Sequence, residues 1–340
     1  MKDDCVVASW QFDGARWLDL QPERPSAIEV RPGVAVGVCT IDRPDSFGNF
    51  LESLAAQRYS ADELIVIDAS RDARTERTLR GFLESGLFPR LTVYERVSGA
   101  AVGLTRQRNR AVRRAEFDLL AFFDDDIVLQ EECLEEMERV HRAWDVPVAG
   151  VAAAILTERT RPTSLWRLRR FLRIVPTLEP GRYCRSGMST PWSFLEASDG
   201  VFEGEWLPGG ATMWRTEVAQ LGFDENFAGY GQGEDLEFSL RARRKGKLLL
   251  AGAARVRHDH TPVGRPNHFR LGYMAIRNRY IIHRTSLPGR SPRDVALFAY
   301  AWTLDTLLLF RHLARPRLWA STIHEVAGRI RASLDLVTGR

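Results

Sequence analysis

Cysteine and long apolar runs are both scarce in this sequence of 340 residues. The four cysteines lie far apart and form no C-x-x-C pair, so neither a zinc knuckle nor a disulfide scaffold is expected. The longest apolar segment, residues 295–310, is interrupted by Asp305 and is shorter than the roughly twenty residues of a membrane-spanning helix. Residues 1–10 have no long apolar core, which argues against a secretory signal. We therefore expect a cytoplasmic protein in a reducing compartment.

The sequence also lacks the common phosphate-binding loops. It contains neither G-x-G-x-x-G nor a P-loop, so ordinary dinucleotide binding and P-loop chemistry are not supported. The net charge of +4 is unevenly distributed, because residues 265–340 hold thirteen arginines and four acidic residues, which is +9, and residues 1–264 carry −5. Since most of the chain is acidic and has no recognised nucleic-acid motif, nucleic acid is not an expected partner.

Alternating strand and helix patterns predict an α/β fold. Residues 34–40 and 63–68 read as buried strands, and residues 46–57 between them as a helix, which makes a βαβ unit and implies a parallel sheet. The same patterns predict helices at 71–90 and 131–144 and strands at 91–94, 118–123, 148–156 and 247–251. We expect a short N-terminal β extension and linker (1–32), an α/β domain with a mostly parallel sheet (33–264), and a basic helical C-terminal region (265–340), whose main helices are 269–282 and 295–310.

Three consecutive acids, Asp124, Asp125 and Asp126, follow the buried strand at 118–123. The carboxyl end of such a strand is where open α/β sheets bind ligands. Asp124 and Asp126 point the same way in extended chain and can reach one divalent ion, either directly or through water. The alternative is a solvated turn whose acids cap the helix that begins near Glu131.

Polar side chains also follow the first two strands. Thr40 with Asp42 ends one strand, and Asp68 with Ser70 ends the other; taken alone, each pair is as consistent with a cap or turn as with a ligand contact. Residues 103–112 read as a glycine loop that leads into an arginine-rich helix. Its alternating arginines cannot all share one helix face, so one or two of them are expected to turn toward the acidic strand end, unless the helix simply carries a solvated basic face.

Two later segments carry further candidates. Gly209 and Gly210 allow a close backbone approach, as the floor beneath a sugar would require. Glu234 and Asp235 end a glycine-rich loop and open a helix, a place that suits a general base, although an N-terminal acid that stabilises the helix is also physically sound.

Two further features are candidate functional sites. One is the pair of histidines that follows the strand near residue 251, and the other is a basic segment. His258 follows that strand and is a credible further metal ligand, and the choice between it and His260 is open. Residues 161–173 interleave arginines with apolar side chains, which is typical of an amphipathic surface helix that meets membrane or an anionic acceptor, or that is merely solvated.

In this order, the pieces resemble the family 2 glycosyltransferases with the GT-A fold. The resemblance covers about two thirds of the chain, residues 34–260. It rests on the strand ends at 39–44 and 67–70, Arg108-Asn109, the D-x-D-like Asp124-Asp125-Asp126, Gly209-Gly210, residues 222–225, Glu234-Asp235 with Arg241, and His258.

The resemblance implies a metal-dependent, inverting hexosyl- or deoxyhexosyltransferase that uses a nucleotide-diphosphate sugar. It implies that Asp235 is the catalytic base with Glu234 beside it, and that a Mn²⁺ or Mg²⁺ ion is held by Asp126 and His258 together with Asp124, which would also contact the ribose or base. The remaining implied nucleotide-sugar residues are Thr40, Asp42, Asp68, Arg108, Asn109, Asp125, Gly209 and Gly210. Two features depart from the family pattern: Asp42 stands where asparagine is usual, and the all-acidic D-x-D lets Asp125 substitute for a neighbour.

Two rival functions remain. A nucleotidyltransferase of similar fold would also bring aspartates and metal to a nucleotide, and a non-catalytic glycan-binding relative would need neither Asp235 nor the metal acids. Glycosidase chemistry is disfavoured, because its paired carboxylates need no nucleotide site. The basic residues 265–340 suit peripheral contact with the inner face of the cytoplasmic membrane and a glycan or lipid-linked acceptor in cell-envelope polysaccharide synthesis, or else packing in a homodimer.

Overall fold

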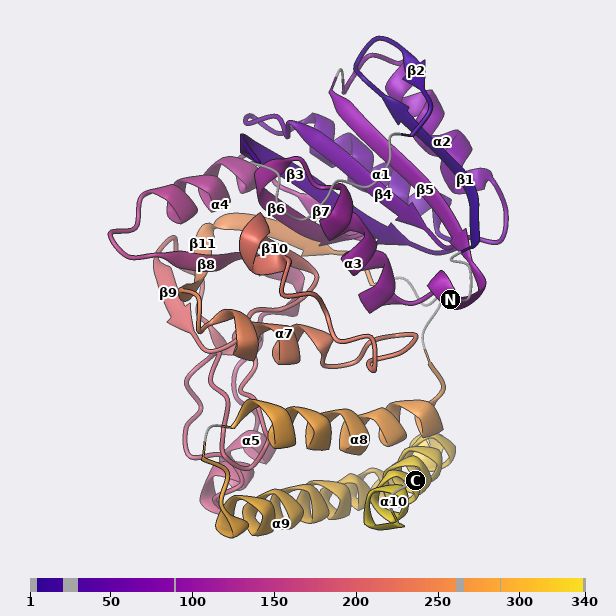
Figure 1. The fold of residues 1–340 in the computed structure, drawn as a ribbon. Coiled ribbons are helices and arrows are strands. Elements are labelled where there is room, and N and C mark those ends of the chain that lie inside the picture. The colour runs from indigo at the N-terminus through magenta and orange to yellow at the C-terminus, as the bar shows by residue number, and fades with distance from the viewer. Residues whose placement is uncertain (1–4, 21–29, 89, 261–265, 288, 339–340) are drawn as a thin grey trace. The chain divides into compact units, whose positions relative to one another are not determined.

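The computed structural model describes residues 5–20, 30–88, 90–260, 266–287 and 289–338 (Figure 1). The chain divides into two compact units: the sheet unit, residues 1–159 and 196–264, and the helical unit, residues 160–195 and 265–340. Residues 160–195 thus group with the C-terminal helices, although the sequence assigned them to 33–264. Most of the expected linker within 1–32, and the expected boundary after residue 264, lie outside the described residues.

Among the described residues, the sheet unit is built on a mixed sheet of eleven strands. The four central strands are parallel, as predicted, and the strands at both margins add antiparallel pairs. In spatial order they are β2 (Trp17–Leu18), β1 (Cys5–Phe12), β5 (Leu91–Ser98), β4 (Glu63–Asp68), β3 (Arg31–Thr40), β6 (Phe117–Asp124), β10 (Ala211–Arg215), β8 (Val148–Ile155), β11 (Lys247–His258) and β7 (Ile127–Leu129), with β9 (Val201–Gly204) paired to β11.

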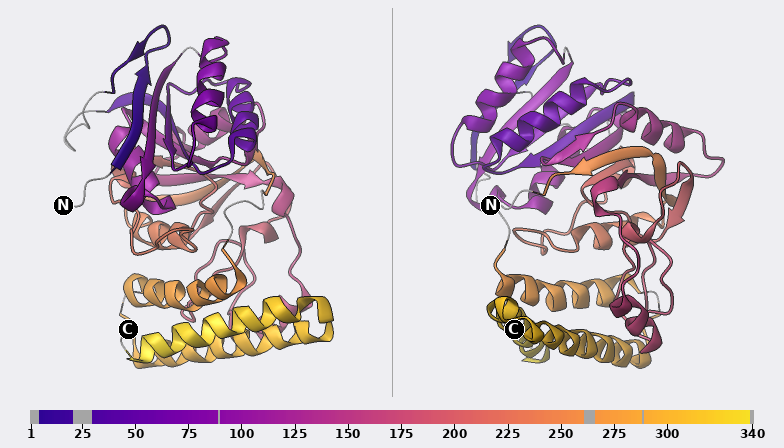
Figure 2. Two further views of the ribbon diagram at one scale, coloured as in Figure 1. Left: turned by 90° about the vertical axis from the view of Figure 1, so that its right-hand side faces the viewer. Right: turned by 180° about the vertical axis from the view of Figure 1, so that it is seen from behind.

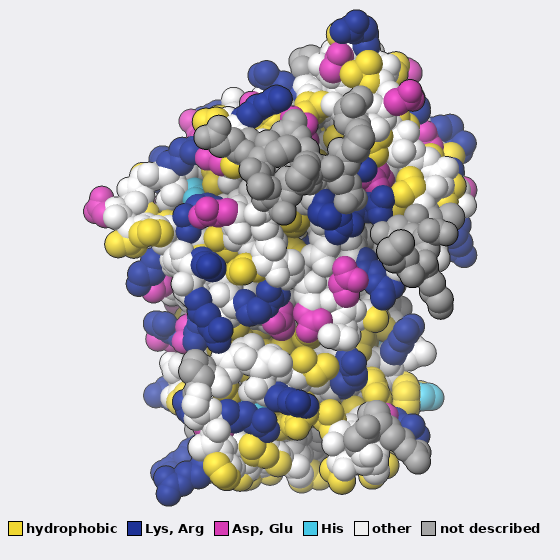
Figure 3. All heavy atoms as spheres, in the orientation of Figure 1, with side chains coloured by type: hydrophobic (Ala, Val, Ile, Leu, Met, Phe, Trp, Pro, Cys, Tyr) yellow, Lys and Arg dark blue, Asp and Glu magenta, His cyan; other side chains and the backbone are white. Residues whose placement is uncertain are grey.

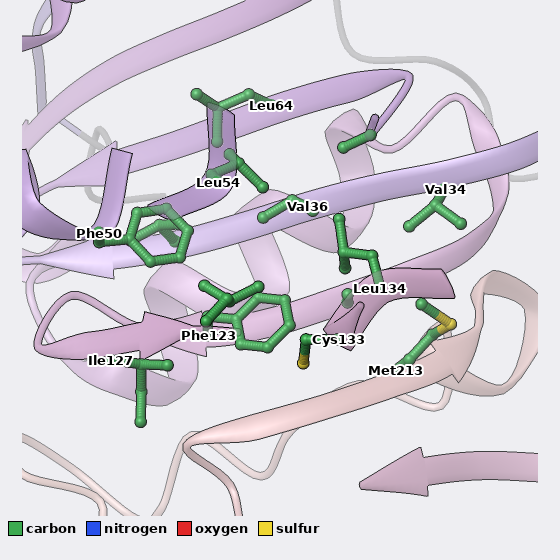
Figure 4. Packing of buried hydrophobic residues seen from close by; sticks show 14 of the residues in the cluster. Val34, Val36, Phe50, Leu54, Leu64, Phe123, Ile127, Cys133, Leu134 and Met213 are labelled. Carbon is green, nitrogen blue, oxygen red and sulfur yellow. The ribbon is translucent and has the colours of Figure 1, made fainter. Parts of the chain in front are cut away.

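Three helices cover one face of this sheet: α1 (Pro44–Ala55), α2 (Arg74–Glu84) and α4 (Cys133–Arg142). Alternate residues of the strands point into this layer, where Phe50 of α1 packs 6.2 Å from Phe123 of β6 between ring centroids (Figure 4). Fully burying one such side chain stabilises the fold by about 1.5–3 kcal/mol. The βαβ arrangement inferred from the apolar patterns is confirmed.

The other face carries α3 (Leu104–Arg114), which contacts β3 and β4, and the aromatic side chains next to α7 (Glu234–Ala242). Phe223 stacks on Phe238 of α7 at 4.3 Å and meets Phe122 of β6 edge to face at 5.7 Å. A short helix, α6 (Thr216–Ala219), follows β10. Side chains that alternate along β6 therefore anchor two different helical layers, so the end of that strand is fixed from both sides.

Several predicted element ends were wrong. The strand at 91–94 continues to Ser98 and the strand at 247–251 continues to His258, while the helix at 71–90 covers only Arg74–Glu84. Charged residues interrupt the apolar pattern in both strands, and charged side chains of other elements form ion pairs with such residues. Glu95, for example, is fully buried in β5 and pairs with Arg110 and Arg114 of α3. Strands β9 and β10 were not predicted.

The helical unit consists of α5 (Ser164–Phe171), α8 (His268–Ser286), α9 (Pro292–Leu308) and α10 (Trp319–Thr338), joined by irregular chain (Figures 1 and 2). Helices α8 and α10 cross with their backbones in contact, because a Cβ atom on Gly272 would lie 2.0 Å from the Glu325 carbonyl oxygen, and one on Gly328 would lie 2.0 Å from that of Phe269. The predicted C-terminal helices are confirmed, and α10 is a further helix within the region that was expected to be helical. None of the described helices has both the length and the apolarity needed to cross a bilayer.

Candidate active site

The acidic strand end lies where the sequence placed it. Asp124 is the last residue of β6 and is half-buried, while Asp125 and Asp126 follow it with only 3% and 5% of their surface exposed. Strands β3, β4 and β6 run parallel, so their carboxyl ends meet at the same edge of the sheet. The three acids are therefore held in a buried turn and not in a solvated one.

Asp125 is turned toward the loop after β3. The Thr40 hydroxyl donates to Asp125 Oδ2 at 2.7 Å, and the Arg43 guanidinium donates to Oδ1 at 2.9 Å. Burial raises the pKa of Asp125 to about 6, although Arg43 and Thr40 oppose this rise. Arg43 also lies 3.5 Å from Asp126 Oδ2. The sequence suggested no role for Arg43, yet its guanidinium pairs with two of the three aspartates.

Asp124, Asp126 and His258 form a potential metal site, because one ligand atom from each lies within 4.8 Å of the other two. His258 ends β11, and its Nε2 atom lies 3.0 Å from Asp126 Oδ1. Its Nδ1 atom lies 2.9 Å from Glu158 Oε1, and His260 is 3.3 Å from the same oxygen. Of the two histidines, it is His258 that lies against the aspartates. No sequence signal pointed to Glu158, which is one hundred residues away in the chain.

The charges around His258 favour a cation. Burial lowers the pKa of His258, but the hydrogen bonds to Asp126 and Glu158 outweigh it and raise that pKa to about 10. Two carboxylates and one imidazole form a donor set that Mn²⁺ or Mg²⁺ accepts, and a metal bound here would displace the ring proton. The residues present therefore fit a divalent ion.

Arg108 connects the two halves of the site. Its guanidinium is buried and donates to Glu234 Oε1 at 2.8 Å and to the Gly209 carbonyl at 2.8 Å, and it lies 3.4 Å from Asp124 Oδ1. This confirms that an arginine of α3 turns inward to the acidic strand end. Burial raises the pKa of Glu234, the charge of Asp235 adds to the rise, and Arg108 opposes it.

Two glycines separate Asp124 from Asp235. A Cβ atom on Gly209 would lie 3.0 Å from Asp235 Cβ and from Glu234 Oε1, and one on Gly210 would lie 3.0 Å from Asp124 Oδ2. Asp235 is half-buried at the start of α7, and its Oδ2 atom accepts the Gly209 N–H at 3.2 Å. Only glycine fits at these two positions without displacing the carboxylates. The two glycines therefore set the distance between the carboxylates.

Three other candidates hold the surrounding loops. Asp68 is fully buried and accepts from the Ser70 backbone N–H at 2.7 Å and the Tyr94 hydroxyl at 2.8 Å; burial raises its pKa. Asp42 has a positive φ of 55° and accepts from Arg71. Asn109 bonds the backbone of Phe223 through both its amide oxygen and its amide nitrogen.

Gln107 supports the same edge and was not anticipated from the sequence. Its Nε2 atom donates to the carbonyls of Thr40 at 3.2 Å and Ile67 at 2.9 Å, which ties α3 to the ends of β3 and β4. The structure thus brings ten predicted residues into one connected cluster and uses Asp42, Asp68 and Asn109 at its margins. The clustered ten are Thr40, Arg108, Asp124, Asp125, Asp126, Gly209, Gly210, Glu234, Asp235 and His258.

Comparison with known proteins gives one family match and several structures of similar fold. The family model described as Glycosyl transferase family 2 matches residues 35–192. Among solved structures, the mannosyltransferase PcManGT from Pyrobaculum calidifontis, in complex with GDP-Man and Mn²⁺, is 15% identical, has a TM-score of 0.55 and aligns over 92% of this chain and 91% of its own. TarS residues 1–349 from S. aureus, in complex with UDP-GlcNAc, is 14% identical over 91% and 92% of the two chains, with a TM-score of 0.48. No curated protein sequence matches this chain.

The matched range begins in β3 and includes the aspartate turn, and the likeness to PcManGT extends the same fold over nearly the whole chain. The α/β architecture with a helical C-terminal region, expected from the resemblance, is confirmed. Residues 35–192, a little under half of the chain, match the model of glycosyl transferase family 2, and the chain has the GT-A fold.

Proposed function

We propose that this chain transfers a sugar, with inversion, from a nucleotide-diphosphate sugar to the hydroxyl of a glycan or lipid-linked saccharide. The observation that carries the proposal is the convergence of Asp124, Asp126 and His258 within 4.8 Å at the carboxyl end of β6. The match of residues 35–192 to a glycosyltransferase family model supports this reading over a nucleotidyltransferase or a glycan-binding protein.

A metal held by Asp124, Asp126 and His258 would supply stabilisation of the charge that develops on the departing diphosphate. The chain's own residues do the rest. Thr40 and Arg43 fix the aspartate turn through Asp125, so the carboxylates are positioned before the donor binds. Because Gly209 and Gly210 have no side chain, Asp124, Glu234 and Asp235 can lie close to the backbone there.

Asp235 is the better of the two candidates for the base. Glu234 is buried and its Oε1 atom accepts from the Arg108 guanidinium, so it positions that arginine between Asp124 and the Gly209 carbonyl. Asp235 is half-buried and receives backbone N–H groups, from Gly209 and Leu236. A carboxylate placed in this way can take the proton of an acceptor hydroxyl as it attacks the anomeric carbon, and a single displacement inverts that carbon.

The test is release of nucleoside diphosphate from UDP-, GDP- and dTDP-sugars with Mn²⁺ or Mg²⁺. PcManGT, whose complex contains GDP-Man and Mn²⁺, supports including GDP-sugars in this panel. We expect slow hydrolysis of one donor, with an inverted anomer visible by proton NMR before mutarotation. Asp235→Asn should lower this rate by about 10²–10⁴-fold while donor binding persists.

The matched control is Glu203→Gln, which alters an exposed acid of the same unit that pairs with Lys247; its rate should equal that of the wild type. Release of pyrophosphate in place of nucleoside diphosphate would establish a nucleotidyltransferase. Absence of both turnover and donor binding across the panel would leave a glycan-binding protein as the better reading.

A further inference from the structure

The helical unit carries a large excess of arginine. Residues 160–195 and 265–340 contain twenty arginines, no lysine and five acidic residues, which is a formal net charge of +15, while the rest of the chain sums to −11. Each of the five acids pairs with an arginine of the same unit. These pairs are Glu179 with Arg182, Asp294 with Arg185, Asp305 with Arg169 and Arg329, Glu325 with Arg329, and Asp335 with Arg331. The field that remains attracts anionic surfaces.

Helix α10 exposes a narrow apolar stripe within this unit. Its members are Trp319, Ile323, Ile330, Leu334 and Val337, of which Ile323 is 59% and Val337 is 86% exposed. At about 100° per residue these five side chains fall within an arc of about 60° on one side of the helix. The opposite side is fixed against α8 through the Gly272 and Gly328 contacts, so the stripe faces outward from the unit.

Arginines stand at the beginning of this stripe. Arg311, Arg315 and Arg317 are all exposed and lie in the segment between α9 and α10, next to the exposed rings of Phe310 and Trp319. Figure 3 shows dark blue and yellow surfaces adjoining over the helices of this unit. Exposed aromatic and aliphatic side chains flanked by cations are the combination found on helices that lie in a membrane interface.

We propose that the α10 stripe, together with Arg311, Arg315 and Arg317, docks on the surface of an anionic lipid bilayer. A bilayer offers both the acyl boundary that five apolar side chains require and the negative headgroups that the arginines require. A second copy of this chain would bring two units of +15 together on this face, and nucleic acid offers no apolar layer for the stripe. Of these three partners, only an anionic bilayer matches both the positive charge and the apolar stripe of the helical unit.

The test is co-sedimentation of the full chain with vesicles of phosphatidylcholine alone, or of phosphatidylcholine mixed with phosphatidylglycerol. We expect binding to the mixed vesicles only, weakened by added salt. Replacing Arg311, Arg315 and Arg317 together by glutamine should weaken binding on the order of a hundredfold. Ile323→Asp with Leu334→Asp should weaken it by about tenfold or more.

Leu87→Asp is the matched control, because Leu87 is 58% exposed but belongs to the sheet unit; it should bind as the wild type does. The arginine variants change only exposed side chains, so they test the proposal even if an aspartate variant fails to fold. Equal binding to both vesicle types, no binding to either, or wild-type binding by the arginine variant would overturn the proposal. A dimer in solution that Ile323→Asp dissociates would assign the stripe to a second copy instead.

Discussion

In the sheet unit, four clustered carboxylates share two arginines, whereas in the helical unit one buried carboxylate contacts two arginines. Asp124, Asp125, Asp126 and Glu234 receive Arg43 and Arg108. Asp305 of α9, which is 4% exposed, pairs with Arg169 of α5 and Arg329 of α10. Carboxylates that are held close together repel one another, so they need further positive charge for stability. A carboxylate that is paired with an arginine does not.

This difference distinguishes a site that can bind a ligand from an ion-pair cluster that stabilises the fold. In the first cluster His258 supplies part of the missing positive charge, and a metal would supply more. In the second, Asp305 joins three helices, and Asp305 together with Glu325 balances the charges of Arg169 and Arg329. Removal of an acid should therefore reduce function in the sheet unit and stability in the helical unit.

The largest effect is expected from Asp126→Asn. This substitution keeps the volume of the side chain but removes a carboxylate of the candidate metal site, so metal-dependent turnover of the donor should fall by about 10³-fold. The free energy of unfolding should change little, or rise, because like-charge repulsion is relieved. Donor hydrolysis and thermal melting without metal measure the two quantities. A variant that melts early and hydrolyses the donor normally would reverse the comparison.

Asp305→Ala should show the opposite pattern. It leaves two arginines without their buried partner, and breaking such a pair costs about 3–5 kcal/mol of unfolding free energy. Donor hydrolysis by the folded fraction should be unchanged. Urea denaturation measures the loss, with Glu179→Ala as the control, because that acid forms an exposed pair with Arg182 and should cost at most about 1 kcal/mol. Equal losses in the two variants would show that Asp305 is not the point that joins the helices.

The buried histidine of the sheet unit gives a pH test. Burial, helped by Arg215, lowers the pKa of His141 in α4 from its ordinary value of 6.5 to about 4. Between these values the unfolded chain binds the proton and the folded chain does not, so stability is lost as the pH falls from 6.5 toward 4, by about 3 kcal/mol. His141→Gln should remove this part of the acid sensitivity in urea titrations at several pH values. An unchanged pH slope would contradict the assignment to His141.

The sequence predicted the acidic strand end because a buried strand that stops at three aspartates is a local pattern. It likewise identified Glu234 and Asp235 from a glycine loop that opens a helix. Both features are patterns of consecutive residues. The parallel arrangement of the strands then brings the carboxyl ends of the strands to the same edge of the sheet.

The sequence could not predict side chains whose roles depend on distant partners. Glu158 reaches His258 across one hundred positions, and Arg43 reaches Asp125 across eighty-two. The predicted ligand contacts Asp68 and Asn109 also bond within the fold, Asp68 to the Tyr94 hydroxyl and Asn109 to the Phe223 backbone, and no local pattern pointed to these partners. Within the helical region 265–340, the sequence did not give the ends of α10, because its outward side is as apolar as its inward side, which blurs the amphipathic pattern.

Glu158 provides the smallest and sharpest test of the site. Its carboxylate accepts from His258 Nδ1 at 2.9 Å, which turns Nε2 toward Asp126. Carboxylates that orient a ligating histidine in this way affect metal affinity by about 10–100-fold when they are replaced. Glu158→Gln should therefore weaken Mn²⁺ binding, measured calorimetrically without donor, and should leave the melting temperature without metal nearly unchanged. Glu203→Gln serves again as the control. If Glu158→Gln bound Mn²⁺ as tightly as the wild type does, the orientation of His258 would be set by β11 alone.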